Sequence, residues 1–372
     1  MWVTLASSAG WSLFPELADS PVMVSSCPVF NLLATYVHNW DPVIFGINEK
    51  IALRWYGLSY VVGFVAAYYI LTRLARKKLW VVGPEKVGDV VTYTALFGVF
   101  LGGRLGYVFF YMIPERGWGV IAEDPMIIFK VWEGGMASHG GILGIMVFTL
   151  FYAWRNKISW PGLGDGIAIV APLGVFFGRI ANFINGELYG TTTAASNWWA
   201  VKFPKSLFEK ENAENLQLAI QQAATSSEEV GAITATLKQD NYEYFHVTGE
   251  AYEKILEIGR RDPEVLKALA DHTPARHASQ LYEGVLEGAL IFAALYAVRV
   301  FLPRLAHGVI SGCFFISYAI FRILVENVRQ PDAEKIMGVT KGQFYSFFMI
   351  AVGIGFLIYA AKSKKGLSTS RE

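Results

Sequence analysis

Charged residues are scarce in this sequence, and long apolar runs separate the ones that are present. Lys, Arg, Asp and Glu make up 17% of the 372 residues, whereas 53% are hydrophobic. Soluble domains of ordinary composition carry about 25% charged residues. Because about 20 consecutive apolar residues cross the hydrocarbon core of a bilayer, this composition predicts an all-α integral membrane protein.

Cysteines and basic clusters are scarce as well. The two cysteines, Cys27 and Cys313, form no pairing motif, which argues against a disulfide scaffold and against a thiolate metal site. The six histidines have no spacing that indicates a metal. The net charge is +1, and no basic stretch is interleaved with aromatic residues. We therefore predict neither a metal site nor a nucleic-acid partner.

Seven apolar segments are candidate membrane spans. They cover residues 52–74, 90–112, 137–154, 165–185, 284–302, 308–325 and 343–361. A long polar stretch separates the fourth span from the fifth. Within it, residues 212–237 and 251–270 have the periodicity of amphipathic helices. We predict a partly helical insert at this position.

Basic residues are concentrated in alternate loops. The segments that follow spans one, three, five and seven contain Arg73, Arg76, Lys77, Lys78, Arg155, Lys157, Arg299, Arg304, Lys362, Lys364 and Lys365. The other loops hold fewer basic residues and more acids. The positive-inside rule then predicts a cytoplasmic C-terminus, and seven spans predict that the N-terminus and the insert lie outside.

These boundaries divide the chain into five parts. We expect an N-terminal extension and outer-surface segment (1–50), a first membrane part (51–190), an extracytoplasmic insert (191–282), a second membrane part (283–362) and a cytoplasmic tail (363–372). The extension has neither a basic n-region nor a clear apolar h-region, so we do not interpret it as a cleaved signal peptide.

The densest set of polar residues inside a span lies at the end of the sixth. Tyr318, Arg322, Glu326 and Arg329 fall within an arc of about 80° if one helix carries all four. A charge inside a span costs about 2.5 kcal/mol or more in free energy of insertion, so these charges must serve a purpose. Two explanations remain open: an Arg–Glu network that links helices, and an anion site that exploits the planar guanidinium.

A second polar set ends the fourth span. Arg179, Asn182 and Gly186 share a helix face, while Asn185 and Glu187 fall where the span should end. Gly186 or Gly190 would let the chain turn there. So many polar groups at a span boundary favour a binding site over packing alone.

The remaining candidates lie at or in the first three spans. Tyr56 opens span one, and Arg104 lies inside span two. His139 lies in the glycine-rich segment 134–141, near the predicted outer end of span three. The glycines would admit a ligand to the backbone, which favours a catalytic histidine. They could equally be helix-packing residues, as could Gly98, Gly102, Gly106, Gly140 and Gly144.

These segments resemble the prolipoprotein diacylglyceryl transferase family. The long signature is residues 178–190, and the other similar segments are 41–45, 54–57, 139–141, 280–283 and 322–332. The resemblance covers residues 41–361 in the expected order. The first forty residues have no counterpart, the region 205–274 is longer than usual, and position 54 is Arg where some relatives have His.

The resemblance implies an enzyme of the bacterial inner membrane. It implies transfer of a diacylglyceryl group from phosphatidylglycerol to the lipobox cysteine of a prolipoprotein, with release of glycerol phosphate and without a cofactor. A free thiol, with a pKa of about 8.5, needs a base, for which we choose His139. Arg179 and Arg322 are expected to stabilise the charge on the departing phosphate. The other expected phosphatidylglycerol ligands are Asn182, Asn185, Glu187, Tyr56, Arg104, Tyr318, Glu326 and Arg329.

Other classes of protein also place charges inside spans. A lipid or solute transporter commonly has related halves and a site near the middle of the bilayer. This sequence has no internal repeat, and its polar residues lie toward one side. A structural scaffold has little use for three deep arginines. The closest enzyme alternative is another transferase that consumes phosphatidylglycerol, and a peptide-thiol acceptor would discriminate between the two.

Overall fold

The computed structural model describes residues 35–46, 52–130, 135–239, 249–330 and 338–363. Most of the predicted N-terminal extension, including Cys27, lies outside the described residues, as do Gly134, residues 331–332 of the last family segment and nearly all of the predicted tail. The part of the chain from Thr35 onward forms one compact unit.

Every predicted span overlaps helical structure, although residues 52–54 at the start of the first span form a strand. The helices are α1 (Trp55–Arg76), the stretch Pro84–Arg116, α6 (Ser138–Arg155), α7 (Trp160–Ile184), the stretch Ser279–Phe301, α14 (Val309–Val325) and α15 (Lys341–Ser363). Among the described residues, five of these are long and apolar enough to cross a membrane, and α6 and α14 are the shorter ones. The protein is therefore a helical, multi-pass membrane protein, and the count of seven spans stays a prediction.

Two of the long helical stretches are built from several segments. The first comprises η2 (Pro84–Lys86), α2 (Val87–Tyr93), η3 (Thr94–Leu101), α3 (Gly102–Tyr107), η4 (Val108–Met112) and α4 (Ile113–Arg116). The second comprises α12 (Ser279–Glu283), η10 (Gly284–Leu290) and α13 (Ile291–Phe301). The segments η3, η4 and η10 are π-helical, a form that often occurs at functional sites. Short helices α5 (Gly119–Glu123) and η5 (Pro125–Phe129) follow α4.

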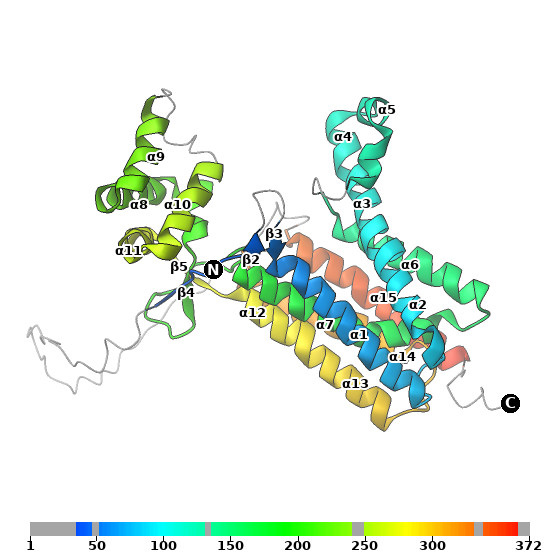
Figure 1. Cartoon of the computed structure of the whole chain (residues 1–372). Coiled ribbons are helices and arrows are strands. Elements are labelled where there is room, and N and C mark those ends of the chain that lie inside the picture. Colours follow the sequence, from blue (N-terminus) through cyan, green and yellow to red (C-terminus); the bar gives the residue numbers. More distant parts are fainter. Residues whose placement is uncertain (1–34, 47–51, 131–134, 240–248, 331–337, 364–372) are drawn as a thin grey trace, which may run out of the picture. The chain divides into compact units, whose positions relative to one another are not determined.

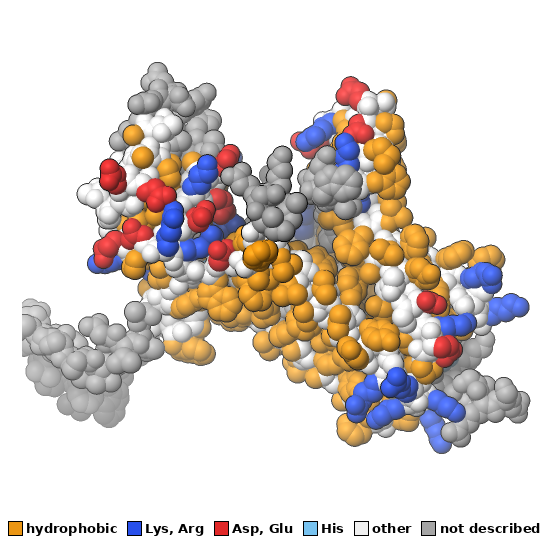
Figure 2. All heavy atoms as spheres, viewed as in Figure 1, with side chains coloured by type: hydrophobic (Ala, Val, Ile, Leu, Met, Phe, Trp, Pro, Cys, Tyr) orange, Lys and Arg blue, Asp and Glu red, His pale blue; other side chains and the backbone are white. Residues whose placement is uncertain are grey.

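Helix α7 is the centre of the bundle, since α1, α6, η10, α13 and α14 all pack against it, and α15 packs against α14 (Figure 1). The buried core of these helices is aliphatic and includes Leu71, Leu163, Ile169, Ile291 and Ile310. On the face shown in Figure 2, hydrophobic side chains cover the bundle almost continuously. An apolar outer surface of this kind is what a bilayer requires.

Glycines allow α3 and η3 to approach α6 closely. A methyl group on Gly102 would lie 2.7 Å from the carbonyl oxygen of Gly140 and 2.8 Å from Cα of Gly144. The packing function predicted for these glycines is therefore confirmed, as is typical of small residues between membrane helices. It also means that Gly140 cannot by itself argue for a ligand beside His139.

A buried ion pair on α7 holds the loop that connects α13 to α14. Asp165 is 1% exposed and accepts hydrogen bonds from Arg299 Nη2 at 3.0 Å and from the backbone nitrogens of Gly308 and Ser311 at 2.9 Å. Four hydrogen bonds, with that of Ser311 Oγ, compensate the buried carboxylate. The assignment of Arg299 to a basic loop was wrong, because this residue lies within α13.

Within the described residues, five short strands add a small amount of β structure to the predicted all-α fold. β1 (Tyr36–Val37) pairs in parallel with β4 (Ala200–Lys202), which pairs antiparallel with β5 (Ala275–His277). β2 (Val43–Gly46) and β3 (Ala52–Arg54) form an antiparallel pair just before α1. The first sheet joins the two ends of the polar insert, so that its helices leave and return at one place.

The insert folds around a core of its own. It contains η7 (Pro204–Phe208), η8 (Lys210–Asn212), α8 (Ala213–Ser226), α9 (Glu228–Gln239), α10 (Gly249–Arg261) and α11 (Pro263–His272). Buried side chains from these helices include Leu207, Ile220, Tyr252, Ile255 and Leu269. Each of the two predicted amphipathic helices is in fact two helices. The first breaks at Ser227, whose backbone is extended, and the second breaks at Asp262, which caps α11 ahead of Pro263.

Candidate active site

One carboxylate holds three arginines at the end of the bundle. Glu283, at the end of α12, is completely buried. Its Oε2 lies 2.6 Å from Arg179 Nη2 and 3.0 Å from Arg322 Nη1, and Arg329 Nη1 lies 3.1 Å from both of its oxygens. The arginines come from α7, from α14 and from the segment after α14. Both anion-site candidates of the sequence, the set around Arg179 and the set around Arg322, thus form a single site.

Two further carboxylates complete the cluster. Glu326 Oε2 forms an ion pair with Arg322 Nη2 at 3.0 Å, and Glu287 Oε1 lies 3.9 Å from Arg322 Nη1. Glu287 is completely buried, and Tyr318 lies beside it. Arg322 is therefore held from two sides, and its two terminal nitrogens pair with different carboxylates.

A turn at the end of α7 brings amide and carboxylate groups to the same place. Arg179 Nη1 donates to Asn182 Oδ1 at 3.4 Å, and Asn182 Nδ2 donates to Glu187 Oε1 at 2.9 Å. Asn185 Nδ2 also donates to Glu187 Oε1, at 3.4 Å. Gly186 makes the turn with a φ of +61°, as predicted. The side chain of Gln280 fixes the turn by donating to the backbone oxygen of Glu187 at 2.7 Å.

Close helix packing explains why the arginines can converge on Glu283. A methyl group on Gly288 would lie 2.8 Å from Cα of Phe176, so η10 lies directly against α7. Arg329 reaches the site from outside a helix, because α14 ends at Val325 and Arg329 forms an isolated bridge with Gly190. The prediction that one helix carries Tyr318 to Arg329 was therefore wrong for Arg329.

The three arginines differ in their access to a ligand. The side chains of Arg179 and Arg322 are 18% and 15% exposed, whereas that of Arg329 is 7% exposed and Glu283 is fully enclosed. The side chains of Arg179 and Arg322 thus each stay partly accessible at the edge of a buried cluster. Prealigned guanidiniums of this kind suit the oxygens of a phosphate group.

The other predicted residues lie in a second group. His139 begins the first turn of α6 and is exposed, and its ring centroid lies 5.5 Å from that of Tyr345 on α15. Arg104 is 2% exposed and donates to the backbone oxygens of Ile127 at 2.6 Å and Gly135 at 3.2 Å. These bonds hold the loop that leads to His139.

The start of α15 connects the two groups. Gly342 lies against the Glu326 carboxylate, because a methyl group there would be 2.7 Å from Glu326 Oε2. Tyr345, three residues further along the same helix, contacts His139. Tyr56, in contrast, makes local contacts: its ring lies 5.7 Å from that of Tyr60, and its backbone oxygen accepts from Ser59.

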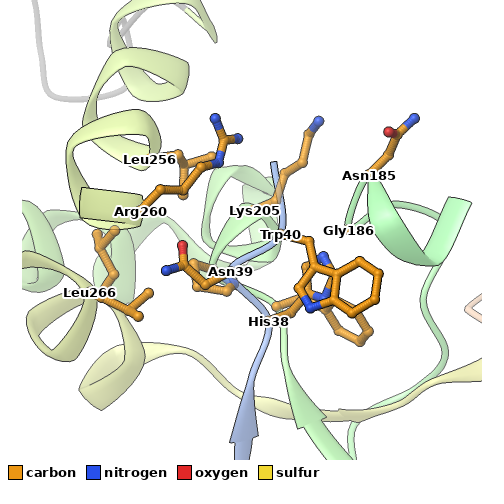
Figure 3. A pocket seen from close by; sticks show the side chains of 12 residues that line it. His38, Asn39, Trp40, Asn185, Gly186, Lys205, Leu256, Arg260 and Leu266 are labelled. Atoms are coloured by element: carbon orange, nitrogen blue, oxygen red, sulfur yellow. The ribbon is translucent and has the colours of Figure 1, made fainter. Parts of the chain in front are cut away.

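A small cavity lies behind the turn. It measures about 30 Å³ and is lined by His38, Trp40, Asn185, Lys205 and Arg260, among others. In Figure 3 the polar ends of Asn185, Lys205 and Arg260 point to the same side. His38 Nε2 donates to the backbone oxygen of Ile184 at 3.0 Å, and burial lowers the pKa of His38. A neutral His38 therefore ties β1 to the end of α7.

Sequence reasoning missed the residue at the centre of the site. Glu283, Glu287 and Gln280 were not among the predicted site residues, although Gln280 and Glu283 lie in a segment that resembles the family. A signal was present, since Glu283 and Glu287 are two acids one turn apart in an apolar span. Such acids are costly unless they have partners.

The fold and the site define a helical, multi-pass membrane protein with a preorganised guanidinium cluster at the end of its bundle. The chain belongs to the prolipoprotein diacylglyceryl transferase family, whose profile matches residues 42–359. It is 37% identical over 333 residues to the phosphatidylglycerol–prolipoprotein diacylglyceryl transferase of Bdellovibrio bacteriovorus, which covers 87% of this chain and 93% of that protein. It is 38% identical over 327 residues to the protein of the same name from Photorhabdus laumondii, with 87% and 94% covered.

Proposed function

We propose that this chain transfers the diacylglyceryl group of phosphatidylglycerol to the lipobox cysteine of a prolipoprotein. The family and the names of the relatives supply both substrates. The observation that carries the proposal is the pair Arg179 and Arg322, which share the buried Glu283 and stay partly exposed. A phosphate diester is the part of phosphatidylglycerol that such a pair recognises.

The reaction exchanges one bond at the glycerol carbon of the lipid. The cysteine sulfur attacks this carbon and forms a thioether, while the bond from the carbon to the phosphate oxygen breaks. The electron pair leaves with glycerol phosphate, which gains negative charge. Arg179 and Arg322 stabilise this charge because their positions are fixed before the reaction by Glu283 and Glu326. The chemistry needs no organic cofactor and no metal.

The thiol must lose its proton before or during the attack. His139 is the base in this proposal, because it is exposed and α15 links it to the carboxylate that holds Arg322. The turn after α7 binds the headgroup through Asn182, Asn185 and Glu187. The cluster is completed by Tyr318, Glu326 and Arg329. Tyr56 and Arg104 stay predicted phosphatidylglycerol ligands, although the bonds described for Arg104 go to backbone oxygens.

A reconstituted assay tests the proposed function. The purified protein is given phosphatidylglycerol and a lipobox peptide, and mass spectrometry follows the peptide. We expect a mass increase of one diacylglyceryl group on the cysteine and release of glycerol phosphate. Phosphatidylethanolamine, which is zwitterionic, should be a much poorer donor because the arginines select an anionic headgroup. Lipid consumption without a modified peptide would indicate a different transferase.

The proposed topology has seven spans, an outer N-terminus, an outer insert and a cytoplasmic C-terminus. It rests on the loop charges and on the family, which also favour the inner membrane and the five-part division of the chain. Ser226, exposed at the end of α8, offers a test. In a variant without Cys27 and Cys313, a cysteine at Ser226 should react with an impermeant thiol label in intact spheroplasts. Labelling that requires lysis would contradict the topology.

A further inference from the structure

A cavity of about 520 Å³ lies between the turn after α7 and the insert. The turn contributes residues 186–189, and Gln330, which follows Arg329, lines the cavity as well. The residues from the insert are Lys205, Phe208, Glu209, Gly249, Tyr252 and Glu253. Pockets that bind small ligands or short chain segments are of about 300–1,000 Å³. The cavity is therefore large enough for a substrate group, and of its lining residues only Glu187 has a role in the proposed mechanism.

The walls of this cavity are fixed by hydrogen bonds. Glu209 Oε1 accepts from Tyr189 Oη at 2.6 Å, and its Oε2 accepts from Arg276 Nη2 at 2.7 Å and from Gln330 Nε2 at 3.4 Å. Tyr252 Oη donates to the backbone oxygen of Pro204 at 2.7 Å. Burial together with Glu209 raises the pKa of Tyr189, so its hydroxyl stays a donor. These bonds pre-form the cavity without a ligand.

Two lining residues connect the cavity directly to the site. Glu187 lines it and accepts from Asn182 at 2.9 Å, and Asn182 contacts Arg179. Gln330 lines it and follows Arg329, which binds Glu283. The cavity therefore adjoins the groups that contact Arg179 and Arg329.

The charge of the cavity lining indicates which of the two substrates the cavity fits. Among the described lining residues, three are carboxylates, Glu187, Glu209 and Glu253, and one is a cation, Lys205. Arg276, outside the lining, pairs with Glu209, so the carboxylates still outnumber the cations. Beyond Glu187, where the headgroup is held beside Arg179 and Asn182, such a lining disfavours an anionic headgroup or released glycerol phosphate. A peptide is not disfavoured, because carboxylates accept hydrogen bonds from its backbone and from basic side chains. Phe208 and Leu188, which are 44% and 40% exposed, add apolar surface.

We propose that this cavity receives the residues that follow the modified cysteine in the acceptor chain. The inference rests on the proposed function. The apolar segment before the cysteine remains in the bilayer, so the polar residues after it must leave the site on its aqueous side. The enlarged insert then acts in acceptor selection, with α10 as one wall, and it contributes no reacting group.

Filling the cavity tests the proposal. A methyl group on Gly249 would lie 3.7 Å from Phe208 Cε1, which is ordinary contact, so the side chain of Gly249→Trp starts without a clash and beside Phe208. Transfer is measured to two lipobox peptides. One ends just after the cysteine, and the other continues for about ten residues, which extend to about 30 Å. Ser226→Trp, exposed on the same insert and outside the cavity, is the matched control.

We expect Gly249→Trp to raise KM for the long peptide by about tenfold and to leave transfer to the short peptide unchanged. Ser226→Trp should alter neither. Equal loss with both peptides in a folded Gly249→Trp variant would overturn the proposal. Absence of transfer to either peptide by the wild-type protein would instead overturn the proposed function itself.

A second variant guards against misfolding of the first. Glu253 is half-exposed and pairs with Lys205 at 3.2 Å, so Glu253→Lys changes the charge of the cavity at its surface. The wild type should prefer long peptides with Lys over those with Asp shortly after the cysteine. Glu253→Lys should reduce or reverse this preference. A preference that is the same in both proteins would contradict the assignment.

Discussion

Arg179→Lys and Arg322→Lys are each expected to lower turnover of phosphatidylglycerol by about 100-fold or more. Lysine keeps the positive charge and loses the planar fork. Arg322 forms ion pairs through Nη1 with Glu283 and through Nη2 with Glu326, and a single ammonium cannot keep both contacts and also meet a phosphate. Initial rates of lipid consumption with a lipobox peptide give the measurement.

Two controls separate loss of chemistry from loss of fold. Arg261→Lys changes an arginine that is 61% exposed on α10 and should leave turnover unchanged. The site variants should insert normally and keep a thermal unfolding midpoint close to that of the wild type, because a cation still faces Glu283. Near wild-type turnover in both site variants would mean that the arginines only link helices. The phosphate would then bind elsewhere.

The helices of the bundle could be predicted from sequence because of a single physical demand. In lipid every backbone polar group must be bonded within the segment, so a long apolar run has to be helical. Residues 165–185 and 343–361, for example, fall within α7 and α15 or end one residue beyond. The helices of the insert are harder to predict, because amphipathic periodicity shows that a segment is helical but continues across a short break between two helices. The break at Ser227 is one extended residue that the periodicity of residues 212–237 conceals.

The guanidiniums of the site could be predicted, but their shared partner could not. Arg179 and Arg322 are conspicuous because a cation inside a span is costly. Their pairing with Glu283 is a tertiary contact between α7, α12 and α14, and no spacing along the chain encodes it. Glu283 was interpreted only as part of the segment that opens span five.

Arg104 shows a second reason why the positions of side chains could not be predicted from sequence. It was grouped with the phosphate-binding arginines because it lies inside a span. In the structure its nitrogens bond to the backbone oxygens of Ile127 and Gly135. The π-helical segments η3 and η4 flank its helix, and each changes the angular register that a regular helix would keep. The face that a residue in such a helix presents therefore cannot be obtained from 3.6-residue periodicity.

A pH–rate profile tests whether His139 is the general base. If His139 accepts the thiol proton, His139→Asn should lower turnover by about 100-fold or more near neutral pH. Asparagine is similar in size and can keep a hydrogen bond, but it cannot take up the proton. Lipid binding should survive, because Arg179 and Arg322 are unchanged. The control Tyr345→Phe keeps the ring that lies 5.5 Å from His139 and should retain nearly all activity.

The deficit of His139→Asn should shrink as the pH approaches about 8.5, the ordinary pKa of a thiol. There the thiolate forms without a base, so the variant regains the nucleophile, while the wild type gains little. His272→Asn, which changes a histidine bonded to Gln222 in the insert, should follow the wild-type profile throughout. A deficit that stays constant from about pH 6.5 to 9 would contradict proton transfer to His139, because loss of basicity must weaken as the thiol ionises by itself. His139 would then position the acceptor through α6 and Tyr345, and Tyr56, Glu187 or the substrate phosphate would be the next candidate for the base.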